Sequence, residues 1–246
     1  MESALFKRLE LFTRLSSEDR AALSRLTTKI RVIEPRKDLI REGDLPTHVN
    51  LVLRGWGARY KMLPDGKRSL VGFFIPGDFC DLNAYVLKQM DHSIGAITSL
   101  RVATIEPSDL LQLMVDRPQV TQALLWHELV NAAVQREWTH NVGARPAFQR
   151  LAHLLVELFM RMQSIGLAEA KNSCDFPLTQ YDLAEATGLT PVHVNRTLQL
   201  LRGESLVEIG QKRLRIPDLA RLQEAAMFNP NYLHLDRDRA NLDPDD

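Results

Sequence analysis

The sequence predicts an α+β protein made of a β-jelly roll, a long helix and a helical domain with a short β-hairpin. Glycine-marked turns recur every 11 to 12 residues between Gly43 and Gly77, a spacing typical of short antiparallel strands. Apolar residues then repeat at helical spacing, and two capped helix starts precede a stretch of strand-like alternation. The 246 residues suffice for two domains of about 100–200 residues each. We expect a barrel with N-terminal helices over residues 1–117, a long helix over 118–143 and a C-terminal domain over 144–246.

Four turns divide the expected barrel, and the segments between them are rich in β-branched, aromatic and apolar residues. The turns are centred on Gly43, Gly55, Gly66 and Gly77. The expected strands cover Val49–Leu53, Ala58–Leu63, Ser69–Phe74 and Ser99–Ile105. The first thirty residues are predicted to be helical instead, with Ser16 or Ser17 capping a helix over Glu18–Leu26.

A long helix from about Pro118 to Val142 is predicted to follow the barrel. One seam repeats at alternating four- and three-residue steps, as in a coiled coil: Val120, Leu124, His127, Asn131, Val134 and Trp138. A second side is formed by Leu125, Leu129 and Ala132. We expect one side to pack on the barrel of the same chain and the other on a second subunit; a helix wholly internal to one chain is the alternative. Gly143 and Pro146 end the helix, because proline cannot continue it, and an amphipathic helix over Phe148–Met162 opens the next domain.

Near the C-terminus, a short run predicts two helices joined by a tight turn. Thr179 and Asp182 fit a capping box, and Gly188 fits the left-handed residue that ends the first helix. Thr190 caps the second helix, with Pro191 at a position where its missing N–H costs nothing. The inward side of the second helix is formed by Val194, Leu198 and Leu201, and the outer face by Val192, His193, Arg196 and Gln199. This pattern is typical of a helix-turn-helix whose second helix enters a DNA major groove, and a helix pair without DNA contact is the alternative.

A β-hairpin is predicted directly after these helices. Leu206–Ile209 and Leu214–Ile216 have strand-like alternation, and the turn between them carries Lys212 and Arg213. A hairpin in this place makes a winged helix, whose basic tip can contact phosphate oxygens. A solvated turn is the alternative. The formal net charge of the chain is +0, so any DNA-binding face has to be local.

The order of these elements, from about Leu11 to Ala226, resembles the Crp/Fnr superfamily of bacterial transcription regulators. The most specific stretch is residues 188–198, together with Asp182 and the Leu-Ala that follows it. The resemblance implies a jelly roll like that of cyclic-nucleotide-binding domains, a dimerisation helix and a winged helix-turn-helix domain. It also implies a homodimer without enzymatic activity that binds an inverted repeat in double-stranded DNA and contacts RNA polymerase.

In that family, the outer face of the second helix reads operator bases. By resemblance, Arg196 contacts guanine, His193 touches DNA, and Thr179 and Thr190 contact phosphates. Val192 and the proline before it depart from the Arg-Glu pair of the catabolite-activator branch, so a different DNA sequence should be preferred. The candidate DNA-binding residues are Thr179, Thr190, Val192, His193, Asn195, Arg196, Gln199, Lys212 and Arg213.

Effector recognition is where the sequence departs most from the family. Cyclic-nucleotide-binding members use a Gly-Glu pair for the ribose and an Arg-Ser or Arg-Thr pair for the cyclic phosphate. Gly77 and Asp78 approximate the first pair, but the second reads Asp91-His92-Ser93 and lacks the arginine. A buried phosphate needs a paired positive charge or several N–H donors, so cyclic-nucleotide binding is disfavoured. The candidate pocket residues are Gly77, Asp78, Leu82, His92 and Ser93, for an unidentified effector.

Two other function classes are alternatives to DNA binding. One is a cyclic-nucleotide-responsive sensor or effector module that acts through protein contacts. The other is a cupin-like metalloenzyme, but only His48 and His92 lie in the barrel region and neither belongs to a ligand-spaced motif. We therefore expect no metal and no cofactor.

The two cysteines, Cys80 and Cys174, cannot hold a four-cysteine iron–sulfur cluster, and redox sensing by Cys80 is left open. The N-terminus lacks a signal-peptide core, and no apolar run is long enough to span a bilayer. We expect a cytoplasmic protein without a membrane partner. The acidic tail from Asp236 to Asp246 is expected to be a mobile, solvated end.

Overall fold

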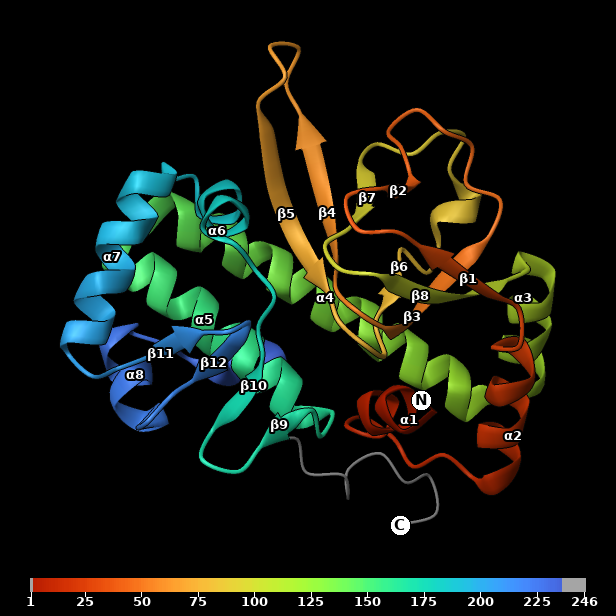
Figure 1. The fold of residues 1–246 in the computed structure, drawn as a ribbon. Helices are drawn as coiled ribbons and strands as arrows, with labels where there is room; N and C mark the ends of the chain where they lie inside the picture. Colours follow the sequence, from red (N-terminus) through yellow and green to blue (C-terminus); the bar gives the residue numbers. More distant parts are fainter. Residues whose placement is uncertain (1, 236–246) are drawn as a thin grey trace. The chain divides into compact units, whose positions relative to one another are not determined.

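The computed structural model describes residues 2–235, and the acidic tail lies outside them. The chain follows the predicted order of strands, long helix and helical domain (Figure 1). The described residues separate into two compact units. Unit 1 contains the chain up to Lys61 together with Gly72–Ala132, and unit 2 contains Met62–Val71 and Ala133–His234. The division falls inside the long helix.

The helices of unit 1 precede and follow its strands in the sequence, and one 3₁₀ turn lies between two of the strands. They are α1 (Glu2–Leu9), α2 (Ser17–Leu26), the 3₁₀ turn η1 (Ala84–Val86), α3 (Pro107–Asp116) and the first part of α4 (Pro118–Ala144). Of the two predicted caps for α2, Ser16 is the one used. Its Oγ accepts from the backbone N–H of Asp19 at 3.1 Å, and Asp19 Oδ2 accepts from the N–H of Ser16 at 3.1 Å. This reciprocal pair is a capping box.

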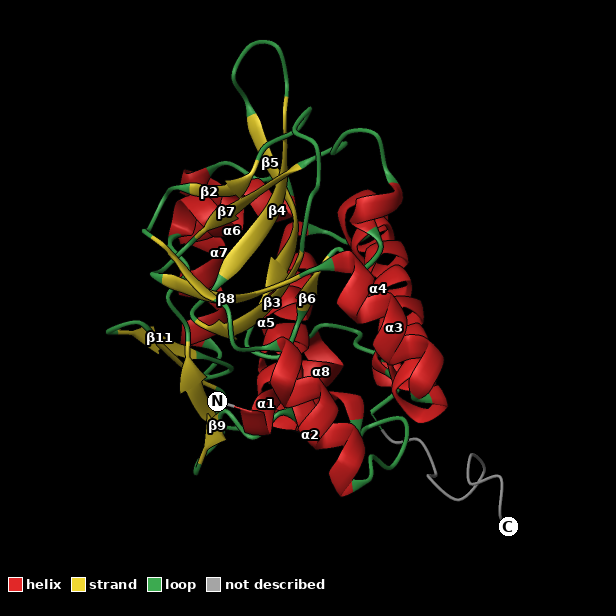
Figure 2. Cartoon of the chain, turned by 90° about the vertical axis from the view of Figure 1, so that its right-hand side faces the viewer, coloured by secondary structure: helices red, strands yellow, loops and turns green. Residues whose placement is uncertain are grey.

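Two four-stranded sheets form the barrel, with strand orders β1-β8-β3-β6 and β2-β7-β4-β5 (Figure 2). The strands are β1 (Ile30–Ile33), β2 (Asp38–Ile40), β3 (Val49–Arg54), β4 (Gly57–Met62), β5 (Arg68–Phe74), β6 (Phe79–Cys80), β7 (Ser93–Ala96) and β8 (Leu100–Ile105). The four predicted strands are β3, β4, β5 and β8, each found within one residue of its expected bounds. The other four have two to four residues each, too few for an alternation to be visible in the sequence.

Strands β3, β6 and β8 of the first sheet have buried residues on both faces, whereas most of β1 is exposed. Val52 of β3 and Val102 of β8 belong to a core between the two sheets, which also contains Phe74 of β5 and Ile94 of β7. The opposite face belongs to a second core, to which all four helices α1 to α4 contribute residues. The sheet residues on that side are Val49, Leu51, Phe79, Ala103 and Ile105. The helical layer therefore belongs to the barrel unit and fixes the outer side of its first sheet.

The predicted seam of α4 is buried within the single chain. Val120, Leu124 and Trp138 are all buried, the first two in the unit 1 core. The other predicted side stays open, since Leu125 is 55% exposed and Leu129 is 59% exposed. The seam is therefore the side of α4 that packs on its own chain.

Unit 2 is built around α5 (Ala147–Ser164), whose apolar side is fully buried. Around it lie α6 (Gln180–Thr187), α7 (Pro191–Gly203), α8 (Leu219–Ala225) and the 3₁₀ turn η2 (Pro230–Leu233). A four-stranded sheet of order β11-β12-β10-β9 completes the unit, with β9 (Ala168–Glu169), β10 (Ser173–Asp175), β11 (Glu208–Gly210) and β12 (Arg213–Arg215). The predicted hairpin is present as β11 and β12, and it is extended by two short strands that precede α6.

Candidate nucleic-acid interface

The turn between α6 and α7 has the predicted geometry. The hydroxyl of Thr179 accepts from the N–H of Asp182 at 3.2 Å, and Asp182 Oδ2 accepts from the N–H of Thr179 at 2.8 Å. Gly188 ends α6 with φ +66°, and its N–H bonds to the carbonyl of Ala184. Because the capping box and the left-handed glycine fix both ends of α6, the chain enters α7 in one defined direction.

Helix α7 is amphipathic in the predicted sense. Thr190 Oγ1 accepts from the N–H of His193 at 3.2 Å, and Pro191 occupies the first helical position. The inward residues are all buried: Val194, Leu198 and Leu201. On the outer face, Val192 is 80% exposed, and His193, Arg196 and Gln199 are exposed as well. The first turns of α7 therefore present side chains to solvent while the core holds the helix in place.

Two outer-face side chains differ in whether they already have partners. Asn195 Nδ2 donates to Gln180 Oε1 at 3.2 Å, which ties α7 to the first turn of α6. The guanidinium of Arg196 forms no hydrogen bond or ion pair with any residue in the described range 2–235. Its five donors are thus available to an acceptor outside the chain.

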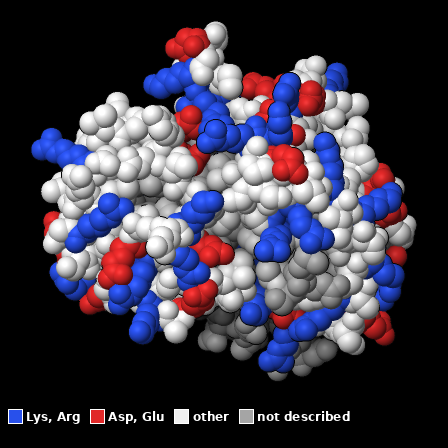
Figure 3. Space-filling model, viewed as in Figure 1, with Lys and Arg blue, Asp and Glu red and all other residues white. Residues whose placement is uncertain are grey.

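At the wing, the two basic residues have different surroundings. The side chain of Lys212 forms no ion pair with the described part of the chain. Arg213 instead bonds to Glu169 Oε1 of β9 at 3.0 Å and to Asp175 Oδ1 of β10 at 3.0 Å. Sequence reasoning missed Arg202, whose Nη2 donates to the carbonyl of Ile209 at 2.9 Å and links α7 to the wing. Figure 3 shows basic side chains interspersed with acidic ones over this face of the molecule, as the net charge of +0 leads one to expect.

In the barrel, three of the predicted pocket residues serve packing. Asp78 Oδ2 accepts from the N–H of Ile75 at 2.8 Å, and its other oxygen pairs with Arg8 Nε of α1 at 3.2 Å. A Cβ on Gly77 would lie 2.8 Å from the carbonyl oxygen of Ala4, so α1 covers this turn. Leu82 lies in the core beneath the helices. The structure therefore places these three residues beneath the N-terminal helices.

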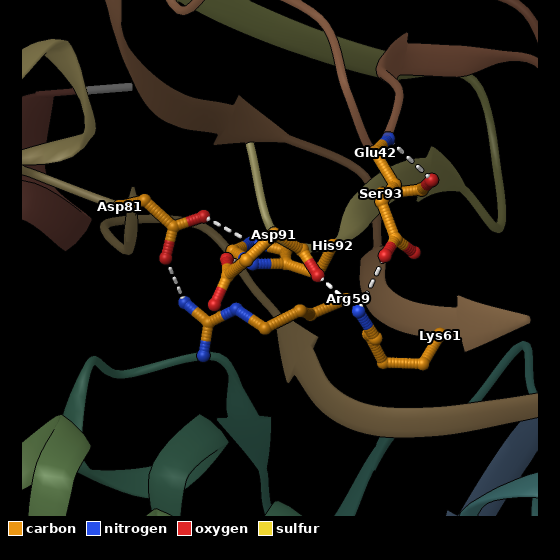
Figure 4. Close-up of polar contacts among 7 residues, drawn as sticks. All are labelled: Glu42, Arg59, Lys61, Asp81, Asp91, His92 and Ser93. Carbon is orange, nitrogen blue, oxygen red and sulfur yellow. Dashed lines mark hydrogen bonds and ion pairs between the residues drawn. The ribbon is translucent and has the colours of Figure 1, made fainter. Parts of the chain in front are cut away.

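His92 belongs to a charged cluster that the sequence did not reveal (Figure 4). Its Nε2 lies 2.7 Å from Asp81 Oδ2, and its Nδ1 lies 2.6 Å from Asp91 Oδ1. Arg59 of β4 bonds to the other oxygen of Asp81 and lies over the ring of Phe74. Asp81 thus already pairs with both Arg59 and His92, and an anionic ligand at this cluster would have to compete with it. Spacing gave no signal, because Arg59 lies 22 residues before Asp81 in a strand.

Ser93 lies beside this cluster but serves the backbone. Its Oγ accepts from the N–H of Glu42 at 2.9 Å (Figure 4).

Burial raises the pKa of Asp81, but the hydrogen bond from His92 and the charge of Arg59 outweigh this effect, and the pKa of Asp81 is lowered from its ordinary 3.8. Asp81 is therefore held as a carboxylate beside Arg59 and His92.

Both cysteines are buried, and burial raises their pKa values, that of Cys174 to about 12. The thiolate, which is the reactive form, is thereby disfavoured at either site. Within residues 2–235, no group of three His, Cys, Asp or Glu side chains could hold a metal ion. No helix of this described part is long and apolar enough to cross a membrane.

Two family models match the chain. One is the Crp-like helix-turn-helix domain over residues 149–225, and the other is the cyclic nucleotide-binding domain over residues 30–117. The nitrogen fixation regulation protein FixK of Bradyrhizobium diazoefficiens is 30% identical over 187 residues, covering 75% of this chain and 76% of FixK. The transcriptional activator protein FnrL of Cereibacter sphaeroides is 27% identical over 216 residues, covering 87% of this chain and 86% of FnrL. The structure of FixK2 from Bradyrhizobium japonicum has a TM-score of 0.71 at 23% identity, covering 80% of this chain and 96% of FixK2.

A jelly roll, a long helix and a winged helix-turn-helix in this order define a class of DNA-binding transcription regulators. This chain belongs to the Crp/Fnr family of that class, as its similarity to FixK shows. The predicted fold and family are thereby confirmed.

Proposed function

We propose that the chain acts as a homodimer that binds an inverted repeat in double-stranded DNA. The exposed Leu125 and Leu129 of α4 supply an apolar surface for pairing two such helices. A two-fold symmetric pair would set its two α7 helices about one DNA turn apart, ~34–36 Å. Half-sites related by the same two-fold axis form an inverted repeat, which explains this choice of operator.

Arg196 is the residue that we propose to read a base. Its guanidinium lies on the outer face of α7 and has no partner in residues 2–235. A planar fork of N–H donors matches the O6 and N7 acceptors of guanine in the major groove. This unpaired arginine on a helix of recognition type is the observation that carries the proposal.

The remaining candidate residues take supporting roles in this proposal. Val192, His193 and Gln199 face outward beside Arg196 and meet base edges, and the exposed Thr190 meets a phosphate. Lys212 contacts a phosphate from the wing. Thr179, Asn195 and Arg213 stay in the set, but their polar groups already have partners within the chain. We therefore assign these three the weaker DNA contacts.

The substitution Arg196→Ala tests the base-reading role. We expect the variant to lose discrimination at one base pair of each half-site, by about 1–3 kcal/mol, because one bidentate contact is removed. Competition binding with all four base pairs at every operator position measures this. If affinity instead falls equally for all sequences, Arg196 is a phosphate contact and the proposal for this residue is wrong.

The barrel unit has roles that go beyond DNA contact in this proposal. FnrL is named a transcriptional activator, and activation requires contact with the transcription machinery. By analogy, we propose that this chain contacts RNA polymerase. We also propose that it acts in the cytoplasm and that it has no enzymatic activity. Gly77, Asp78, Leu82, His92 and Ser93 remain candidate effector residues, with the Asp81 cluster as the barrier that an anionic effector must displace.

A further inference from the structure

Arg150, in the first turn of α5, bonds to the carboxyl ends of two other helices. Its Nη1 donates to the carbonyl oxygen of Thr187, the last residue of α6, at 2.8 Å. Its Nε and Nη2 donate to the carbonyl oxygen of Arg145, directly after the end of α4, at 3.2 Å and 2.9 Å. One guanidinium thus bridges the end of the long helix and the end of the first helix of the helix-turn-helix.

The chemistry of these contacts requires an arginine. The last carbonyls of a helix lack partners within it and carry the negative end of the helix dipole, so a cation there is favourable. Thr187 is 1% exposed, and a buried carbonyl without a partner is costly. A guanidinium has N–H groups on separate edges and reaches both carbonyls at once, whereas a lysine ammonium is a single point.

The parts that Arg150 joins are also held from the other side. Arg145 and the proline after it form the two-residue elbow between α4 and α5. Arg145 Nη2 pairs with Glu137 of α4 at 2.7 Å, and Asn141 of α4 donates to the carbonyl of Arg150 at 3.1 Å. A Cβ built on Gly188 would lie 3.7 Å from Val142 and 3.9 Å from Arg150 Nη1, so both side chains lie beside the turn before α7. Polar contacts through Arg150 therefore tie the end of α6, directly before the turn into α7, to the elbow and the last turns of α4.

We infer that Arg150 is a positioning residue that sets the angle of the recognition helix to α4, and with it the half-site spacing that the dimer accepts. This inference rests on the proposed function. In a dimer paired through α4, the distance between the two α7 helices depends on the angle at each elbow. Loss of the bridge loosens that angle without removing any group that touches DNA.

The test compares the wild type with Arg150→Lys on operators that have identical half-sites and different spacers. Each added or removed base pair changes the distance between half-site centres by about 3.4 Å. We expect the wild type to lose roughly tenfold in affinity for a spacer that is wrong by one base pair, the scale of a mismatched base pair. In Arg150→Lys this ratio should fall toward about twofold, while affinity for the best operator drops and base preference within each half-site is retained.

Tyr232→Phe is the matched control. It removes the hydrogen bond from Tyr232 to the buried Glu157 in the same unit, at 2.9 Å, and leaves the elbow intact. We expect it to lower the melting temperature and to keep the spacing preference of the wild type. If Arg150→Lys does not fold, Arg145→Gln, which releases the elbow from Glu137, is measured in its place.

The outcomes separate this inference from the proposed function. An unchanged spacing ratio in a folded elbow variant would overturn the positioning role and leave Arg150 as a stabilising cap. A wild type that binds no operator at any spacing would instead contradict the proposed function itself. Relaxed spacing in Tyr232→Phe as well would also overturn the inference, because any loss of stability would then have the same effect.

Discussion

Lys212 and Arg213 are adjacent at the tip of the wing, but only one of them is free to contact DNA. Arg213 is paired with Glu169 and Asp175, whereas Lys212 has no side-chain partner in residues 2–235. We expect Lys212→Ala to lower affinity evenly for all sequences and to reduce the slope of log affinity against log salt by about 1, because one phosphate contact is lost. Arg213→Ala should change that slope less. Binding titrations over a range of salt concentrations measure both, and equal slopes for Lys212→Ala and the wild type would argue against the phosphate contact.

His92 lies between two carboxylates, and its protonation is linked to theirs. Burial lowers its pKa, but the hydrogen bonds to Asp81 and Asp91 and the charge of Asp81 outweigh this and raise the pKa above its ordinary 6.5. A pKa raised on folding adds stability at low pH, and that stability is lost as the pH rises from 6.5 through the raised value. We expect the free energy of unfolding to decline over this range, and to decline less in His92→Gln. Denaturant unfolding at several pH values measures it; the same decline in both proteins would show that His92 is not the group responsible.

Residue-scale contacts were the least accessible from sequence. The outward placement of Arg196 follows from helical spacing alone, and the structure agrees with it. The pairing of Arg59 with Asp81 and of Glu157 with Tyr232 joins residues 22 and 75 positions apart. Such pairs depend on how strands and helices pack, so no local pattern reports them.

At the scale of elements, Gly188 ends helix α6 in a left-handed backbone conformation that favours glycine. Its φ is +66°, and an added Cβ would meet its neighbours only at ordinary contact distance, so the penalty of a side chain lies in the backbone. We expect Gly188→Ala to lower the free energy of unfolding by about 1–2 kcal/mol. Gly188→Asn should cost less, because asparagine adopts the left-handed conformation more readily. Urea unfolding of both variants measures this, and equal losses would mean that packing, rather than the backbone, decides the cost.

Elements with local chemical signals were predicted, and those without were missed. The caps at Thr179 and Thr190 and the glycine at 188 can be identified from neighbouring residues, and the structure confirms all three. Strands β9 and β10 have two and three residues; β10 pairs with the wing strand β12, and β9 pairs with β10. Helix α3 was missed although it begins at Pro107, and proline at a first helical position is a local signal of a helix start.

For the whole molecule, the two sides of α4 have different roles. The seam that resembles a coiled coil is buried in its own chain, while Leu125 and Leu129 stay exposed. The spacing of apolar residues along a helix does not show which partner that side packs on, because a barrel and a second helix both favour apolar residues. The exposed side is therefore the surface on which the proposed dimer depends.

The most direct test of the central claim is selection of DNA sites from a random pool by the purified protein, with no effector added and at near-physiological salt. We expect an enriched inverted repeat, with half-site centres about one DNA turn apart, 10–10.5 base pairs, or a multiple of it. A guanine that loses enrichment with Arg196→Ala should lie in each half-site. Enrichment of a single, unrepeated site would contradict the dimer, and a pool that stays random would contradict DNA recognition by the protein without an effector.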